Sequence, residues 1–434
     1  MKQVNVGICG LGTVGSGTFN VLSRNKDDIN ARAASNIVVS HIGARRPNSA
    51  CDTTGVNISA DIFAVAEDPD IDILVELIGG TTVAKDLVVR ALQNGKHVVT
   101  ANKALIAEFG NELFDIAKNH KVTISYEAAV AGGIPIIGAL REGLAANKIE
   151  WLAGIINGTG NFILTEMRDK GREFEDVLEE AQALGYAEAD PTFDVEGIDA
   201  AHKLVILSSI AFGTPLQFEK VFTEGISKVS PLDVFYAGEL GYSIKHLGLT
   251  RKRENGIELR VHPTLIPKTR LLANVDGVMN AIVVKGDAVG PTLYYGAGAG
   301  SEATASAVIA DIVRVSRLVG ERVNLNVPPL GYSLDKLSSD DVLPIEQTET
   351  AFYLRIAAVD KPGVLSKISQ ILSDAGISIE ALIQKEPKED QEFVPLIILT
   401  NKAIEKNIID AIEKIEQLDT VKENVVRIRV ESLK

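Results

Sequence analysis

The feature that most constrains the fold is a glycine-rich turn between a short apolar run, residues 4–9, and a segment with a helical pattern. The turn consists of Gly10, Leu11, Gly12, Thr13, Val14 and Gly15. In such a turn the first glycine permits a tight bend, the second lets a pyrophosphate approach the backbone, and the third lets helix and strand pack closely. The free N–H groups of the helix N-terminus also attract phosphate. The motif alone is weak, but its place at the first strand–helix junction predicts a dinucleotide-binding fold.

Alternating strand and helix patterns continue to about residue 130. The predicted strands are 37–42, 71–78, 97–100 and 122–126, and the predicted helices are 84–93 and one between the last two strands. This alternation predicts a parallel sheet with helices on both faces. We therefore expect an α/β fold with a Rossmann-type NAD(P)-binding domain at residues 1–130. A helix of small residues at 301–320 is expected to return and complete this domain.

The pattern changes near residue 131, where helices and longer strands mix. Predicted helices begin near Ile134, Phe162, Phe174 and Gly197, and predicted strands are 243–249, 257–265, 278–285 and 289–294. Such a mixture predicts an α+β catalytic and dimerisation domain at residues 131–300. The polar segment 330–349 has no clear periodicity and is interpreted as a linker.

The C-terminal residues 350–434 form a complete pattern of their own. It runs strand 352–359, helix 363–374, strand 377–384, strand 393–400, helix 402–416 and strand 425–430. This order predicts a ferredoxin-like βαββαβ domain. Because the segment has its own strands and helices, we expect it to regulate the rest of the chain without taking part in chemistry.

The end of the second predicted strand bears on the choice of cofactor. An NAD site places an acidic residue about 20 residues beyond the glycines, where it binds the ribose hydroxyls. Here the sequence reads His-Ile-Gly-Ala-Arg-Arg at 41–46, with no acid. Because a guanidinium suits phosphate, Arg45 and Arg46 favour NADP, with NAD possible as a second cofactor. The alternative is that one or both arginines are simply solvated, which is an equally good reading for Arg46.

The stretch 185–203 carries the densest chemistry. Its carboxylates are Glu188, Asp190, Asp194, Glu196 and Asp199. Asp199 and Lys203 are spaced i,i+4 and share one helix face, where an exposed pair would contribute only about 0.3–0.5 kcal/mol. The helix is otherwise apolar, so we expect the pair to face a cleft. Oxidation of an alcohol by hydride transfer needs a group that moves the hydroxyl proton, and Lys203 suits this role. The nearby carboxylates would hold an ammonium group.

Four other segments are candidates for the same site. Ala101-Asn102-Lys103 follows a predicted strand at the sheet edge where ligands bind. The run 157–161 is rich in amide and hydroxyl donors, although it also fits a turn with a helix cap. The turn 126–134 has adjacent glycines that could direct several carbonyls at a hard cation. A second glycine loop at 296–300 could approach cofactor or substrate.

Composition excludes several classes of function. The formal charge of −14 argues against nucleic-acid binding. No apolar stretch approaches the roughly 20 residues needed to span a bilayer, and no signal peptide is visible before the first strand. Cys9 and Cys51 are too few for a disulfide framework, so we expect a cytoplasmic protein.

Taken together, the glycine turn, 101–103, 157–161, 185–203 and 296–300 resemble the homoserine dehydrogenase family in content and order. The resemblance implies interconversion of L-homoserine and L-aspartate 4-semialdehyde with NAD or NADP. It implies that Lys203 is the acid/base lysine and Lys103 a second lysine near the nicotinamide and the reacting oxygen. One departure is Gly160, where the family often has a second threonine.

The same resemblance implies further ligand contacts. The substrate amino group would be held by Glu188 and Asp199, with Asp194 nearby. A structural Na⁺ would be bound by main-chain oxygens of Glu127, Val130, Gly132 and Ile134. Cofactor contacts would come from Thr13, Val14, Arg45, Lys103, Gly185 and Gly300, beside Gly10, Gly12 and Gly15.

The C-terminal segment resembles an ACT domain. The resemblance rests on Asp-Lys-Pro-Gly-Val-Leu at 360–365, between a predicted strand and helix. Such domains pair side by side and bind small amino acids between them, which implies a homodimer or homotetramer. In the biosynthetic pathway that a homoserine dehydrogenase serves, the natural effector would be L-threonine.

Two other functions remain open at this stage. The first is a different Rossmann oxidoreductase that acts on another amino-acid semialdehyde or alcohol. Aspartate-semialdehyde dehydrogenase itself needs a catalytic cysteine, and neither Cys9 nor Cys51 is well placed. The second is a regulatory protein that binds NADP and an amino acid without turnover, which the Asp199/Lys203 pair argues against.

Overall fold

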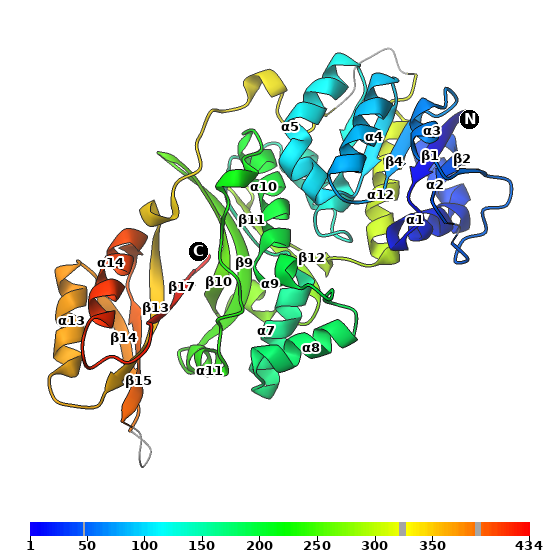
Figure 1. Cartoon of the computed structure of the whole chain (residues 1–434). Coiled ribbons are helices and arrows are strands. Elements are labelled where there is room, and N and C mark those ends of the chain that lie inside the picture. The colour runs from blue at the N-terminus through cyan, green and yellow to red at the C-terminus, as the bar shows by residue number, and fades with distance from the viewer. Residues whose placement is uncertain (47, 321–326, 387–391) are drawn as a thin grey trace.

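The chain contains three parts that follow one another across the molecule. The computed structural model describes residues 1–46, 48–320, 327–386 and 392–434. Figure 1 shows the N-terminal sheet and its helices at one end, long central strands in the middle, and the C-terminal strands and helices at the other end. Within the described residues no helix is long and apolar enough to cross a membrane.

The N-terminal part is built on a parallel sheet with strand order β3-β2-β1-β4-β5-β6. Its strands are β1 (Lys2–Cys9), β2 (Ser35–Gly43), β3 (Asn57–Ser59), β4 (Ile73–Glu76), β5 (His97–Thr100) and β6 (Ile124–Ser125). The chain runs from β1 to β2 on one side and from β3 back to β4 on the other. The turn after β1 therefore lies where ligands bind in such sheets. The predicted parallel α/β architecture is confirmed.

Helices cover both faces of this sheet. They are α1 (Thr13–Arg24), α2 (Lys26–Ala33), α3 (Phe63–Glu67), α4 (Thr82–Gln93), α5 (Lys103–Asn119) and α12 (Ser301–Ser316). The returning helix α12 packs beside α1, as Figure 1 shows. Val308 and Ile312 of α12 join the buried core formed by Val6 and Ile8 of β1. The predicted return of this helix to the first domain is thus present.

The remaining strands form one continuous sheet through the central and C-terminal parts. In the described residues its order is β12-β11-β7-β9-β10-β17-β13-β15-β14, with β8 and β16 at the side. The strands are β7 (Ile149–Ile155), β8 (Phe222–Thr223), β9 (Tyr242–Arg253), β10 (Gly256–Pro267), β11 (Met279–Gly286), β12 (Gly290–Ala297), β13 (Glu349–Val359), β14 (Ile379–Gln384), β15 (Phe393–Thr400), β16 (Ala403–Ile404) and β17 (Val426–Val430). The two parts join where β10 pairs in parallel with β17, through Thr264 with Arg429 and Leu265 with Val430.

Helices of both parts pack on this long sheet. They are α6 (Ile136–Gly138), α7 (Gly158–Lys170), α8 (Phe174–Ala183), α9 (Thr192–Val195), α10 (Ile198–Phe212), α11 (Pro231–Glu239), α13 (Val364–Asp374) and α14 (Glu405–Glu416). Short helical turns are η1 (Glu127–Ala129), η2 (Ala139–Gly143), η3 (Phe218–Lys220), η4 (Leu271–Asn274), η5 (Leu334–Lys336) and η6 (Ile345–Gln347). One buried cluster contains Tyr236 and Leu265 of the central part together with Tyr353, Leu399 and Ile428 of the C-terminal part. The two parts therefore share hydrophobic core as well as sheet.

The segment predicted as a linker is fixed to the central sheet. Apart from the turns η5 and η6 it is irregular, but Leu330 is fully buried and Leu337 packs on the main core. The N–H of Ile257 donates to the carbonyl of Asp341 at 3.0 Å, and the N–H of Leu343 donates to the carbonyl of Ile257 at 2.8 Å. These contacts leave little freedom for a hinge in this segment.

The helix expected from Ile134 is much shorter than its apolar pattern suggests. The structure has three α-helical residues, α6, followed by the wider π turn η2. The buried Glu127 carboxylate accepts the N–H groups of Ile137 and Gly138, both at 2.8 Å. The helix start is therefore fixed by a residue ten positions earlier, which periodicity does not reveal.

Candidate functional site

The glycine turn after β1 is shaped to receive a phosphate. Gly10 has φ +103°, and a Cβ there would lie 2.6 Å from the Leu77 carbonyl oxygen. A Cβ on Gly15 would lie 2.0 Å from the Gly10 carbonyl oxygen, so this glycine permits close packing. A Cβ on Gly12 would meet nothing within 4 Å, which leaves open space above the turn. Gly12 also caps α1 without a side-chain acceptor, so the first N–H groups of Thr13 and Val14 remain available to an anion.

The loop after β2 places two exposed arginines close to this turn. Arg45 and Arg46 are exposed, and within the described residues neither has an ion-pair or hydrogen-bond partner. Asn48 ties the loop to the glycine turn, because its Nδ2 donates to the Leu11 carbonyl at 2.8 Å. The arrangement fits a cofactor that carries negative charge beyond its pyrophosphate.

The second glycine loop reaches the same region from the end of β12. Gly300 has φ +121° and caps the start of α12. The next residue, Ser301, donates its hydroxyl to the Thr13 carbonyl at 2.7 Å. Gly300 therefore lies beside the first turn of α1, next to the proposed phosphate site.

A cluster of charged side chains lies at the start of α10. Lys203 Nζ is 2.6 Å from Asp199 Oδ2 and donates to the Ile156 carbonyl at 2.7 Å. Lys103, at the start of α5 in the N-terminal part, approaches the other oxygen of Asp199 at 3.1 Å. Asp199 is buried, whereas the Lys103 side chain is one-third exposed. The structure thus brings together both lysines that the sequence singles out, from helices about 100 residues apart.

Asn157 joins this cluster to a second carboxylate. As the cap of α7, its Oδ1 accepts the N–H of Gly160 at 2.7 Å. Its Nδ2 lies 2.8 Å from both Asp194 Oδ1 and Asp199 Oδ2. The run 157–161 is therefore a helix cap and a site element at once.

Burial and charge act in opposite directions on the two carboxylates. Burial alone raises the pKa of the Asp199 carboxyl, but the charges of Lys203 and Lys103 outweigh it and hold that pKa well below its usual range. For Asp194, burial raises the pKa, the hydrogen bond from Asn157 opposes the rise, and the charge of Asp199 adds to it. Asp199 is therefore the firmly ionised partner of the lysines, and Asp194 is the carboxylate that an added cation would stabilise.

Other predicted residues lie at the edge of this cluster. Gly185 and Glu188 are exposed, and within the described residues the Glu188 carboxylate has no hydrogen bond or ion pair. Their loop is held at the start of α7, where the Thr159 hydroxyl donates to the Tyr186 carbonyl at 2.6 Å. The structure therefore places this loop beside Asn157 but does not bring Glu188 into contact with Asp199.

Sequence reasoning missed an aromatic stack behind the cluster. The His202 ring lies between Phe193 and Phe218, with centroid distances of 5.4 and 4.1 Å. Its Nε2 is 3.2 Å from Glu108 of α5, and Lys103 Nζ lies 5.7 Å from the Phe193 ring centroid. Phe193 and His202 both fall within the acid-rich stretch 185–203. The i,i+3 spacing of Asp199 and His202 could have indicated that this histidine lies near the cluster. Phe218 lies in no motif and could not be found that way.

The turn expected to bind Na⁺ is compact and buried. Ala131 has φ +48°, and the N–H of Ile134 donates back to its carbonyl at 2.6 Å. A Cβ on Gly132 would lie 2.7 Å from the Thr304 hydroxyl of α12, so glycine is needed there. Within the described residues, no donor bonds to the carbonyls of Val130 and Gly132, whereas those of Glu127 and Ile134 accept the N–H groups of Val130 and Ile136.

Comparisons with known proteins agree with this geometry. The family model described as "Homoserine dehydrogenase" matches residues 135–313, and that described as "Homoserine dehydrogenase, NAD binding domain" matches residues 10–127. The model of the ACT domain matches residues 352–417. These matches confirm the predicted fold class of an N-terminal dinucleotide-binding domain, a catalytic domain and a C-terminal ACT domain.

Individual relatives match over the whole chain. The homoserine dehydrogenase of Pseudomonas aeruginosa is 64% identical over 433 residues, which is 100% of both chains. A crystal structure of a homoserine dehydrogenase from Thiobacillus denitrificans has a TM-score of 0.95 and 59% identity, and the match covers 100% of this chain and 99% of that one. A hyperthermophilic archaeal homoserine dehydrogenase in complex with NADPH has a TM-score of 0.61 and 29% identity. It matches 72% of this chain and 98% of its own.

Proposed function

The chain belongs to the homoserine dehydrogenase family, and we propose that it interconverts L-homoserine and L-aspartate 4-semialdehyde with NADP. The observation that carries the proposal is the contact of Asp199 with both Lys203 and Lys103 beside the dinucleotide-binding sheet. A steady-state assay with L-homoserine and each cofactor, and with the semialdehyde in reverse, tests it. Folded protein that turns over neither substrate would refute the proposal.

Each residue of the cluster would have a separate role in alcohol oxidation. Bound NADP supplies the hydride acceptor. Lys203, as the neutral amine, takes the hydroxyl proton as the hydride leaves, and Lys103, as the ammonium, stabilises the same oxygen. Asp199 holds both lysine side chains in place, because its low pKa leaves it ionised. Glu188 and Asp199 hold the substrate ammonium group, with Asp194 nearby, where burial raises the pKa of the Asp194 carboxyl and an added cation would lower it.

We assign the cofactor as NADP, with NAD as a possible second cofactor. The open space above Gly12 fits a pyrophosphate, since any side chain there would fill it. The absence of an acid at 41–46 removes the group that would repel a 2′-phosphate, and Arg45 supplies the charge that would attract it. The NADPH bound to the archaeal relative supports the same choice.

We also propose a structural Na⁺ in the turn 127–134. The Val130 and Gly132 carbonyls, which have no donor within the described residues, would be its main ligands, with Glu127 and Ile134 completing the set. Hard cations take oxygen ligands of this kind. The ion would brace the turn between β6 and α12 and would take no part in proton transfer.

The ACT domain is compatible with regulation, and we propose L-threonine as the feedback effector in threonine, methionine and isoleucine biosynthesis. Asp360 is exposed at the turn after β13, and its Oδ1 accepts a hydrogen bond from Gln384 of β14 at 2.9 Å. The carboxylate and the N–H groups near Gly363 can meet the two charges of an amino acid. Within the described residues β14 ends the sheet, so a second copy can pair beside it in a homodimer or homotetramer.

A further inference from the structure

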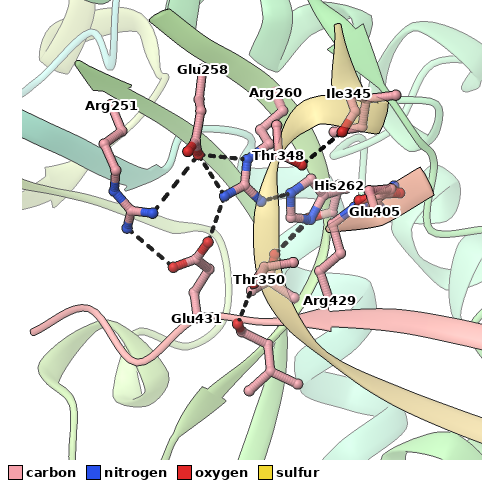
Figure 2. Close-up of polar contacts among 12 residues, drawn as sticks. Arg251, Glu258, Arg260, His262, Ile345, Thr348, Thr350, Glu405, Arg429 and Glu431 are labelled. Carbon is pink, nitrogen blue, oxygen red and sulfur yellow. Dashed lines mark hydrogen bonds and ion pairs between the residues drawn. The ribbon is translucent and has the colours of Figure 1, made fainter. Parts of the chain in front are cut away.

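Buried charges join the central part of the chain to the C-terminal domain. Figure 2 shows Glu258 and Arg260 of β10 beside Glu431, which lies just after β17, and His262 on the other side of Arg260. Arg260 Nη2 lies 2.9 Å from Glu258 and 2.5 Å from Glu431. Arg260 and Glu258 are each 1% exposed. Since removing one partner of a buried ion pair is strongly destabilising, each side of the junction stabilises the other.

A second ion group, buried at Arg429 and Glu405 and partly exposed at Glu224, lies beside the first and reaches further into the catalytic domain. Arg429 of β17 is fully buried and donates from Nε to Glu405 of α14 at 2.8 Å. Its Nη1 donates to Glu224 of the central part at 3.0 Å, and Arg427 lies 3.6 Å from the same carboxylate. Glu224 is therefore one of three carboxylates of the catalytic domain that pair with cations of the ACT domain within the described residues, beside Asp233 with Arg355 and Glu239 with Lys385.

The backbone around Glu224 is bonded to the residues that precede α10. The N–H of Ile226 donates to the Val195 carbonyl at 2.9 Å, and the Ser227 hydroxyl donates to the Glu196 carboxylate at 2.9 Å. A Cβ on Gly225 would lie 2.3 Å from Glu196 Oε2. The segment 224–227 thus fits tightly against 195–196, three residues before Asp199.

A buried histidine reinforces the same contact. His246 of β9 donates from Nε2 to the Glu224 carbonyl at 3.0 Å. Its ring lies against Gly197, where a Cβ would be 3.1 Å from His246 Cε1. Gly197 has φ +84° and begins α10, so a shift of Glu224 would be transmitted to the turn that orients Asp199.

We propose that Glu224 is a positioning residue for homoserine binding, and that Arg429 of the ACT domain holds it in place. Through the segment 224–227 and His246, the pair fixes the start of α10 and hence the direction of the Asp199 carboxylate. The C-terminal domain then helps to hold Asp199 in its substrate-binding position even when no effector is bound. This inference rests on the role proposed above for Asp199 in the substrate site.

The variant Glu224→Gln in the full chain tests the inference. It removes the charge that Arg429 holds but preserves size, and Arg429 remains paired with Glu405. We expect the KM for L-homoserine to rise about 2- to 30-fold, the range for mutations along a coupling route. The KM for NADP should stay unchanged, because the glycine turn lies on the other sheet. Glu224→Asp, which keeps the charge, should restore much of the loss.

Glu239→Gln is the matched control. It also removes a carboxylate that pairs across the same two domains, with Lys385 at 2.9 Å, but this pair is exposed and lies on α11. The control should keep wild-type constants. An unchanged KM for homoserine in Glu224→Gln, or equal rises for both substrates with a lowered melting temperature, would overturn the inference. If Glu224→Gln does not fold, the folded variants Glu224→Asp and Glu239→Gln are compared instead. A KM for homoserine that is raised to the same extent in both variants would overturn the inference.

The failure of the inference can be told apart from failure of the site assignment. If Asp199→Asn binds and turns over homoserine normally, the assignment of Asp199 is wrong and the inference falls with it. If Asp199→Asn raises the KM for homoserine but Glu224→Gln does not, the assignment stands and only the inference is wrong.

Discussion

At the scale of single residues, one carboxylate pairs with the charged side chains of the proposed active site. Asp199 contacts Lys203 and Lys103 through different oxygens, and Asn157 bridges it to Asp194. Two cations and two carboxylates are thus held within one hydrogen-bonded group in which charges are paired. In the proposed function, an alcohol bound beside this group would meet a lysine whose position is set by packing and hydrogen bonds, which is what proton transfer requires.

Replacing Lys203 with alanine should nearly abolish turnover. We expect kcat to fall about 10²- to 10⁴-fold, the usual cost of a missing general acid/base. NADP should still bind, because its glycine turn follows β1 of the N-terminal sheet whereas Lys203 lies on α10, and tryptophan or NADPH fluorescence titration measures this. Lys85→Ala is the control, since that lysine lies outside the cluster, in a partly exposed pair with Glu112 and over the Phe109 ring. Near-normal kcat in Lys203→Ala would show that the proton leaves by another route.

Replacing Arg45 with alanine tests the cofactor assignment. Loss of a charge-assisted contact to the 2′-phosphate should raise the KM for NADP about tenfold or more, while the KM for NAD changes little. Arg46→Ala serves as the comparison, because both arginines are exposed and only one needs to read the phosphate. If the KM values for NADP and NAD move together, or neither moves, Arg45 is not the phosphate reader.

At the scale of elements, local sequence patterns predict the helices, strands and turns, but they do not predict the contacts between distant segments. The glycine turn, the i,i+4 pair on α10 and the strand–helix order of the ACT domain all follow from local sequence. The position of Lys103 against Asp199 could be expected only from resemblance, because the two lie on helices of different domains. The short helix α6 begins where the Glu127 carboxylate accepts its first N–H groups. Phe218 contacts His202 only because the fold brings the two together, and no sequence spacing predicts that contact.

The turn between β13 and α13 carries the prediction about regulation. Asp360→Ala should raise the L-threonine concentration for half-maximal response about tenfold or more, the cost of losing a hydrogen bond to a charged group. The kcat without threonine should be unchanged, since the turn lies far from α10 in Figure 1. Asp374→Ala, at the other end of α13, is the control. Calorimetry with threonine and a parallel inhibition assay measure the response, and identical behaviour of both variants would count against this site.

At the scale of the whole molecule, the sequence predicts separable domains and the structure shows shared sheet and core. No local signal announces that β10 pairs with β17, because these strands lie more than 150 residues apart and each has a normal strand pattern. The arginines Arg260 and Arg429, within predicted strands, are the sequence feature that could have indicated the junction between the two parts. Fully buried arginines are rare unless paired, and their partners Glu431 and Glu224 lie across the junction.

Truncation after Pro329 tests how far the two parts depend on each other. The match to the archaeal relative covers 72% of this chain and 98% of its own, so a shorter homoserine dehydrogenase of this fold exists. In this chain the cut would expose β10 as an edge, uncover Leu265 and remove Glu431 from Arg260. We expect the truncated chain to fold but to melt about 10 °C lower, as loss of a buried ion partner implies.

The same truncated chain should bind NADP normally, show a raised KM for homoserine, and give no response to threonine. NADP binding should be normal because the parallel sheet and α12 are untouched. The KM for homoserine should rise because Glu224 loses Arg429 and Arg427. Thermal denaturation with and without NADP, followed by the homoserine assay, measures all three. A truncated chain with full-length melting temperature and wild-type constants would mean that the ACT domain is a detachable module. In that case the buried junction would serve assembly alone.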